Sequence, residues 1–151
     1  LKFKIQLDIF GDGSEKKYLQ KLVNELNMNG IINFKGKYDY NNLPELLVKY
    51  NLYVSTSSSD AGLSASTSEA MSVGLPVISS DNSENKYWLN YNGYLYKTGD
   101  IQNLTDKILE FISDSPKKIN NYRIKARRKI EIENSFYVEM DKITQIYEGK
   151  Y

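Results

Sequence analysis

The sequence contains neither cysteine nor histidine, and these two absences exclude more functions than any single motif. In a chain of 151 residues, the lack of cysteine rules out a disulfide framework and a thiolate metal site. It also fits a reducing compartment. The lack of histidine removes the commonest general base, proton shuttle and metal ligand. Any chemistry must therefore use carboxylates, hydroxyls, lysines and backbone dipoles, or groups outside the chain. We expect no metal ion and no cofactor.

A strong charge imbalance and a long apolar run are missing as well. Lys and Arg total 20 and Asp and Glu total 19, so the net charge of +1 gives no reason to expect a nucleic-acid partner. No apolar run approaches the roughly 20 residues that a membrane span needs. A signal-peptide pattern is absent, and the first residue is Leu1 rather than Met. We therefore expect an excised piece of a longer protein, with one domain and a real core.

Short apolar strands alternate with amphipathic helices along the chain. Strands are predicted at residues 1–10, 31–35, 52–54, 76–79 and 94–96. Helices are predicted at residues 14–26, 43–50, 64–73, 84–89, 101–112, from 116 onward, and 136–147. This alternation predicts a single α/β domain of Rossmann-like, three-layer layout with a mostly parallel sheet.

Three finer expectations follow from the helix patterns. Ser14 is placed to cap the first helix. The helix at 101–112 should bury a stripe made of Leu104, Ile108, Leu109 and Ile112. The last helix carries an apolar side made of Phe136, Met140, Ile143 and Tyr147.

Residues 60–78, with the sequence DAGLSASTSEAMSVGLPVI, carry the clearest functional signal. A strand, a loop, a helix N-terminus and another strand follow one another here. That order builds a small-molecule site at the carboxyl end of a parallel sheet. Unpaired N–H groups and the helix dipole would favour a phosphate at this helix start. The hydroxyls of Ser64, Ser66, Thr67 and Ser68 would add donors, or would only cap the helix.

Three other features leave two interpretations open. Glu69 could accept two hydroxyls of a ribose, or be an ordinary solvated acid near a helix start. Gly11-Asp12-Gly13 could cradle a phosphate, or only make a tight turn from strand to helix. A basic set could face an anionic membrane or be a solvated helix face. Its members are Lys117, Lys118, Arg123, Lys125, Arg127, Arg128 and Lys129.

Four segments follow one another along the chain: LDIFGDGSEKKYLQKLVNEL, IINFKGKYDYNNLPELLVKYNLYVSTSSSDAG, SEAMSVGLPVISSDNSEN and NGYLYKTGDIQNLTDKI. In this order they resemble the carboxyl-terminal half of family 4 glycosyltransferases, which are retaining enzymes of the GT-B fold. The final helix, residues 136–147, is similar to the closing helix of that family. The resemblance implies a donor-binding domain that covers residues 1–151. It also implies that the amino-terminal acceptor domain, and the first strand and helix of the donor domain, lie outside this chain.

The resemblance assigns roles to individual residues. It implies that Glu69 holds the nucleotide ribose and that the main-chain N–H groups of Ser64 and Ala65 face the donor diphosphate. The turn against the base is Gly36, Lys37 and Tyr38, and the loop at the donor sugar is Asp60, Ala61, Gly62 and Leu63. The sequence departs from the family at Ala61, which replaces the first of two glutamates. Asp60, one residue earlier, becomes a candidate for the sugar contact.

The function implied is transfer of a hexosyl-type sugar from a nucleotide-sugar to an acceptor hydroxyl, with retention. The acceptor would be a glycan or a lipid-linked molecule in polysaccharide or glycolipid synthesis. No residue is expected to be a catalytic base, and the isolated chain is expected to be inactive. We expect a cytoplasmic location, with peripheral contact at the inner face of the membrane as a further option.

Two alternatives stay open at the level of the sequence. The first is a non-catalytic α/β nucleotide-binding or signalling module, such as a receiver domain. A receiver needs acids at the ends of its first and third strands, whereas Asp8 lies inside the first strand and the third ends in serines. The second is a sugar-nucleotide epimerase of the same fold, which would depend on histidines.

Overall fold

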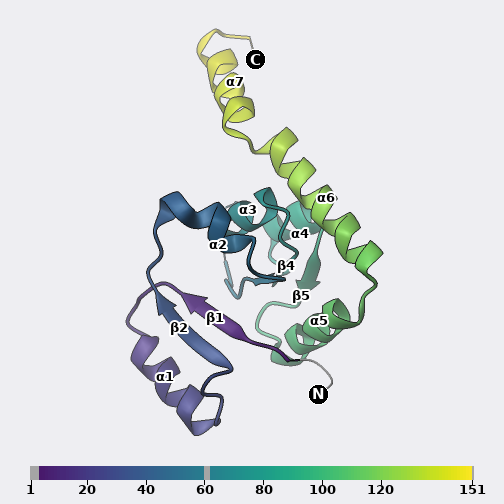
Figure 1. The fold of residues 1–151 in the computed structure, drawn as a ribbon. Coiled ribbons are helices and arrows are strands. Elements are labelled where there is room, and N and C mark those ends of the chain that lie inside the picture. The colour runs from purple at the N-terminus through teal and green to yellow at the C-terminus, as the bar shows by residue number, and fades with distance from the viewer. Residues whose placement is uncertain (1–3, 60–61, 151) are drawn as a thin grey trace. The chain divides into compact units, whose positions relative to one another are not determined.

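The computed structural model describes residues 4–59 and 62–150 and shows a mixed α/β protein whose strands pair in parallel (Figure 1). The chain forms two compact units, Leu1–Leu43 and Pro44–Tyr151, here called the first and second unit. The expected α/β class with parallel pairing is confirmed. The described strands form a two-stranded sheet and a three-stranded sheet.

The first unit pairs β1 (Leu7–Phe10) with β2 (Ile32–Gly36) and carries α1 (Lys16–Glu25) and a short 3-10 helix, Tyr40–Asn42. Strand β1 is shorter than the alternating pattern predicts. Its pairing begins where Leu7 meets Ile32, so the described residues before it, 4–6, have no partner in β2. The prediction that Ser14 caps the first helix is wrong: Glu15 takes the N-cap position, and its side chain makes no capping bond.

The second unit is built on a parallel sheet in the order β3 (Tyr53–Val54), β4 (Val77–Ser80), β5 (Tyr94–Tyr96). Five further helices follow α2 (Leu43–Leu47), and their bounds are α3 (Ala65–Ser72), α4 (Ser83–Leu89), α5 (Ile101–Ser113), α6 (Pro116–Glu133) and α7 (Phe136–Tyr147). These bounds lie close to the predicted ones. Among the described residues, no helix is both long enough and apolar enough to cross a membrane.

Strand β4 supplies both faces of the core. Val77 and Ile78 are consecutive, so their side chains lie on opposite faces of the sheet, and both are fully buried. Val77 belongs to a cluster with Met71 of α3, Leu89 of α4, and Ala126 and Ile130 of α6. A second cluster joins Ile78 to the two tyrosines of β5 and the apolar side of α5. At about 1.5–3 kcal/mol for each large apolar side chain, these two clusters dominate the stability of the unit.

The apolar side of α5 differs in part from the predicted stripe. Leu104, Ile108 and Phe111 pack against the second cluster, whereas Leu109 is 46% exposed. Residues 104, 108 and 111 follow one another at spacings of four and three, which places them on one helical face. Leu109 lies next to Ile108 in the chain and is therefore turned away from that face.

Helix α7 extends away from the end of α6 (Figure 1). The predicted apolar side of this helix is present but exposed. Its residues are Phe136 at 73%, Met140 at 42%, Ile143 at 43% and Tyr147 at 88%.

Gly93, directly before β5, is predicted to tolerate no side chain. A Cβ at this position would lie 2.8 Å from the carbonyl oxygen of Val77 and 3.1 Å from Cδ2 of Leu89. Since a main-chain atom of the central strand cannot move freely, Gly93→Ala should lower the free energy of unfolding by roughly 1–3 kcal/mol. Urea denaturation measures this.

Gly13→Ala is the matched control. A Cβ at Gly13 would meet no atom within 4 Å, and its φ is not in the left-handed region. Equal stability losses in the two variants would contradict the steric explanation.

Candidate functional site

The candidate site lies at the carboxyl end of the parallel sheet in the second unit, where β3 leads into α3. In open α/β sheets, ligands bind outside the carboxyl ends of the strands. The loop after β3 begins at Ser55, whose N–H donates to the carbonyl of Ile78 at 2.9 Å. It ends at Ser64, the N-cap of α3. The sequence therefore located the expected loop and helix start correctly.

Ser64 caps α3 through its hydroxyl. Its Oγ accepts a hydrogen bond from the N–H of Thr67 at 3.4 Å and donates to the Thr67 hydroxyl at 2.8 Å. Thr67 is fully buried, whereas Ala65 and Ser66 are exposed. The capping interpretation of Ser64 is confirmed. The first turn of α3 nevertheless stays open to solvent at Ala65, which is the condition for a phosphate to approach the main-chain N–H groups.

Two other hydroxyls of this segment already have protein partners. The Ser66 hydroxyl accepts from the hydroxyl of Tyr53 in β3 at 2.8 Å. The Ser68 hydroxyl accepts from the side-chain amide of Asn134, at the end of α6, at 3.0 Å. These bonds fasten α3 to the sheet and to α6, so the two hydroxyls serve the placement of the helix.

Glu69 lies in the second turn of α3 and is half-buried. Its main-chain carbonyl accepts a hydrogen bond from the Ser72 hydroxyl at 2.7 Å. Within residues 4–59 and 62–150, no side chain or N–H group forms a hydrogen bond or ion pair with its carboxylate. A half-buried carboxylate without a protein partner retains both oxygens as acceptors for a ligand hydroxyl.

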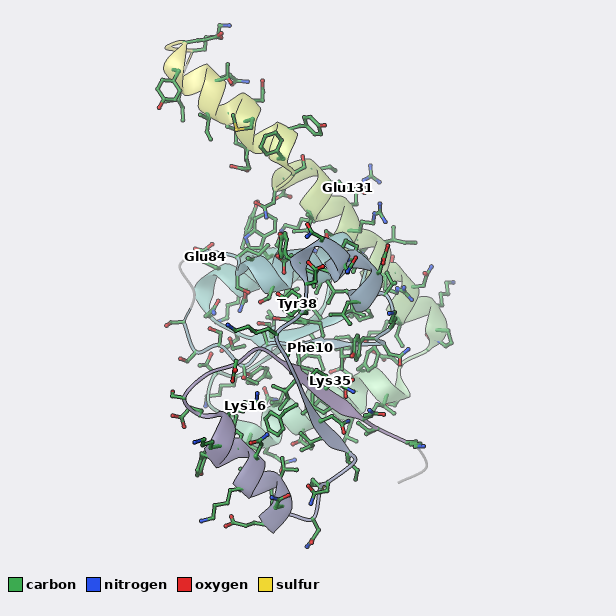
Figure 2. The ribbon with its side chains drawn as sticks, turned by 60° about the vertical axis from the view of Figure 1, so that its left-hand side comes forward. Phe10, Lys16, Lys35, Tyr38, Glu84 and Glu131 are labelled. Atoms are coloured by element: carbon green, nitrogen blue, oxygen red, sulfur yellow. The ribbon has the colours of Figure 1, made fainter. Side chains whose placement is uncertain are left out.

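The predicted base-contacting turn lies in the first unit. Gly36 ends β2 with a φ of +73°, which favours glycine, and its carbonyl accepts from the N–H of Gly11 at 2.7 Å. The Tyr38 ring meets the ring of Phe10 edge to face, with centroids 6.1 Å apart. Both residues are labelled in Figure 2. Lys37 is exposed. The turn and the Gly11–Gly13 segment therefore meet at the carboxyl ends of β1 and β2.

The predicted donor-sugar loop is described only in part. Asp60 and Ala61 lie outside the described residues. Gly62 has a φ of +99°, which favours glycine. Leu63 packs against the first core cluster, which holds this end of the loop in place.

Sequence reasoning missed several polar side chains at the same end of the sheet. The Ser80 hydroxyl donates to the carbonyl of Ser57, and the Tyr96 hydroxyl donates to the carbonyl of Ser55. Burial raises the pKa of Tyr96. Asn85 of α4 donates from its amide to the Ser79 hydroxyl and the Ser80 carbonyl. The sequence signal for these contacts was the pair Ser79-Ser80 at the end of β4. A pair of serines is also typical of a loop, so the sequence alone did not identify them as buried hydrogen-bonding residues.

One charged group also lies at this end of the sheet. Asp81 follows β4 and accepts from the main-chain N–H of Thr98 at 2.9 Å and from its hydroxyl at 3.0 Å. These two bonds lower the pKa of Asp81, and Lys86, 3.4 Å away, lowers it further. The part of the chain that the structure describes contains no group of three acidic, histidine or cysteine residues that could hold a metal ion.

Curated relatives of this chain are glycosyltransferases. The chain is 29% identical over 121 residues to the GtfA subunit of the UDP-N-acetylglucosamine–peptide N-acetylglucosaminyltransferase of Limosilactobacillus reuteri. This matched region covers 74% of the chain and 23% of the relative. It is 32% identical over 117 residues to the poly(ribitol-phosphate) alpha-N-acetylglucosaminyltransferase of Staphylococcus aureus. This matched region covers 73% of the chain and 22% of the relative. The chain thus spans less than a third of the length of these relatives.

A solved structure shares the fold. The chain matches Anabaena Alr3699/HepE, solved in complex with UDP and glucose, with a TM-score of 0.83 and 21% identity, over 95% of this chain and 40% of that one. The family model described as "Glycosyl transferases group 1" matches residues 1–129. Because this match covers most of the sequence, the chain belongs to the glycosyl transferases group 1 family.

Proposed function

We propose that this chain is the donor-binding domain of a longer, retaining glycosyltransferase, and that the nucleotide part of the donor binds at the start of α3. The observation that carries this proposal is the half-buried carboxylate of Glu69. It has no partner among the described residues and lies one turn beyond an exposed helix start. Membership of the family supplies the class of reaction.

The proposed contacts follow the chemistry of a nucleotide-sugar. The Glu69 carboxylate would accept both hydroxyls of the ribose, since one carboxylate can bind a vicinal diol through two oxygens. The main-chain N–H groups at Ser64 and Ala65 would face the diphosphate, where the helix dipole favours negative charge. Gly62 and Leu63 would line the sugar, together with Asp60 and Ala61. Separately, Gly36, Lys37 and Tyr38 would contact the base.

Known relatives favour a uridine nucleotide. One relative is a UDP-N-acetylglucosamine–peptide transferase and another is an alpha-N-acetylglucosaminyltransferase. The Anabaena protein was solved in complex with UDP and glucose. We infer that the donor here is a UDP-linked hexose or N-acetylhexosamine. The acceptor would be a glycan or lipid-linked hydroxyl, used in polysaccharide or glycolipid synthesis in the cytoplasm or at the inner face of the membrane.

The proposed reaction needs no basic side chain from this domain. A bond forms between the acceptor oxygen and the anomeric carbon, while the bond from that carbon to the diphosphate oxygen breaks. The acceptor proton passes to the leaving diphosphate on the same face of the sugar, which retains the anomeric configuration. The domain contributes positioning of the donor and electrostatic stabilisation of the leaving group. This mechanism is compatible with a chain that contains no histidine.

The remaining parts of the longer enzyme would supply the acceptor domain. Known relatives are more than three times as long as the matched region, since it covers 23% and 22% of two of them. We propose that the parts outside this chain also provide a first strand and helix of the donor domain. Catalysis would then take place in a cleft to which this chain contributes only the donor side.

Glu69→Ala should weaken UDP binding by about 10- to 100-fold in the full-length enzyme. Two hydrogen bonds to a charged acceptor are worth roughly 1.5–3 kcal/mol each, and competition with water reduces the net loss. Isothermal titration with UDP alone measures the effect. Glu45→Ala is the matched control, because Glu45 is an exposed acid in the first turn of α2. Unchanged affinity in Glu69→Ala would contradict the ribose assignment.

The isolated 151-residue chain should transfer no sugar. It contributes only the donor side of the proposed cleft, so the acceptor hydroxyl cannot be held against the donor. The measurement is transfer from radiolabelled UDP-N-acetylglucosamine and UDP-glucose to water and to lipid-linked acceptors, with the full-length enzyme as the positive control. Product above the enzyme-free blank would show that this chain is a complete catalyst.

A further inference from the structure

The loop that follows β3 is fastened to the two neighbouring strands by buried hydroxyls. The hydroxyl of Ser80, the last residue of β4, donates to the carbonyl oxygen of Ser57 at 2.5 Å. The hydroxyl of Tyr96, the last residue of β5, donates to the carbonyl oxygen of Ser55 at 3.4 Å. Ser80 is 0% exposed and Tyr96 is 5% exposed. Two carbonyls of the loop are therefore bound by strand ends that belong to the core.

Ser80 is itself fixed by α4. The side-chain amide of Asn85 donates to the carbonyl of Ser80 at 3.1 Å and to the hydroxyl of Ser79 at 2.9 Å. The N–H of Asn85 donates to the side chain of Asn82, the N-cap of α4, at 3.0 Å. Asn85 is fully buried. Because buried polar groups are costly to leave unpaired, this arrangement gives Ser80 little freedom to turn away from the loop.

Ser79 and Ser80 form a natural comparison within one strand. Both are completely buried serines at the end of β4. Consecutive strand residues face opposite sides of the sheet, and the two hydroxyls have different partners. The Ser79 hydroxyl bonds to α4, whereas the Ser80 hydroxyl bonds to the loop after β3. Removing either hydroxyl loses one buried hydrogen bond, but of these two serines only Ser80 has a described bond to the loop.

We propose that Ser80 is a positioning residue for the donor sugar, acting through the Ser57 carbonyl. This inference rests on the proposed function. Residues 55–59 carry the chain from β3 toward the part of the loop assigned to the donor sugar. Glu69 and the start of α3, assigned to the nucleotide, are held by separate contacts to Tyr53 and Asn134. Loss of the Ser80 bond should therefore misplace the sugar while the nucleotide still binds.

The experiment compares Ser80→Ala with Ser79→Ala in the full-length enzyme. In Ser80→Ala, hydrogen exchange of the Ser55 amide, which is buried and donates to the Ile78 carbonyl, should become at least tenfold faster. The kcat with saturating donor should fall about tenfold or more, since small misplacements of reacting groups are costly. Affinity for free UDP should change less than about twofold. In Ser79→Ala, exchange of the Ser55 amide and kcat should stay within about twofold of the parent enzyme.

Two results would overturn the proposal. Equal losses of kcat in both variants would make Ser80 a structural residue only, and unchanged exchange of the Ser55 amide in Ser80→Ala would show that its bond does not hold the loop. A parent enzyme that fails to bind UDP would refute the proposed function instead. The exchange comparison would still decide whether Ser80 fixes the loop, because it needs no donor.

Discussion

The second unit depends on the complete burial of β4. Val77 and Ile78 are fully buried on opposite faces of this strand, and each anchors one of the two core clusters. Parallel neighbours on both sides satisfy the main chain of the strand. Since apolar burial is the main favourable term in folding, helices α3, α4, α5 and α6 are all placed by their contact with this strand or its cluster partners.

At the carboxyl end of the same strand, buried polar residues replace buried apolar residues. After Val77 and Ile78 come Ser79 and Ser80, whose buried hydroxyls bond to α4 and to the loop after β3. A core strand thus ends in a set of directional hydrogen bonds. Apolar packing fixes where the strand lies. The hydroxyls then hold the loop beside the candidate nucleotide site in a defined position relative to the strand. Functional residues on a loop held by a rigid framework are the usual arrangement in α/β enzymes.

Much of the fold could be predicted because local signals agreed with one another. Ser64 as a cap, Pro116 at a helix start and the strand at residues 94–96 lie where the sequence placed them. The prediction that Ser14 caps the first helix failed because residues 13–16 form a turn, in which the N–H of Lys16 donates to the carbonyl of Gly13, and the helix begins only after Glu15. The prediction that Leu109 is buried failed because the predicted stripe contained one residue more than a single helical face can bury.

The candidate site was less predictable than the fold. The run of Ser and Thr near α3 indicated a helix start, but which hydroxyl bonds to which partner depends on contacts distant in sequence, such as Asn134 with Ser68. The roles of Ser80, Asn85 and Tyr96 have the same origin, because each reaches a carbonyl or hydroxyl in a different element. Pattern and propensity describe one segment at a time, so bonds between segments become visible only in three dimensions.

The central claim is that α3 binds the nucleotide of a UDP-sugar, with its ribose at Glu69. A crystal structure of the full-length enzyme with UDP tests it most directly. We predict that both ribose hydroxyls lie within hydrogen-bonding distance of the Glu69 carboxylate and that the diphosphate faces the N–H groups at Ser64 and Ala65. A ribose bound elsewhere, with the Glu69 carboxylate facing solvent, would contradict the account.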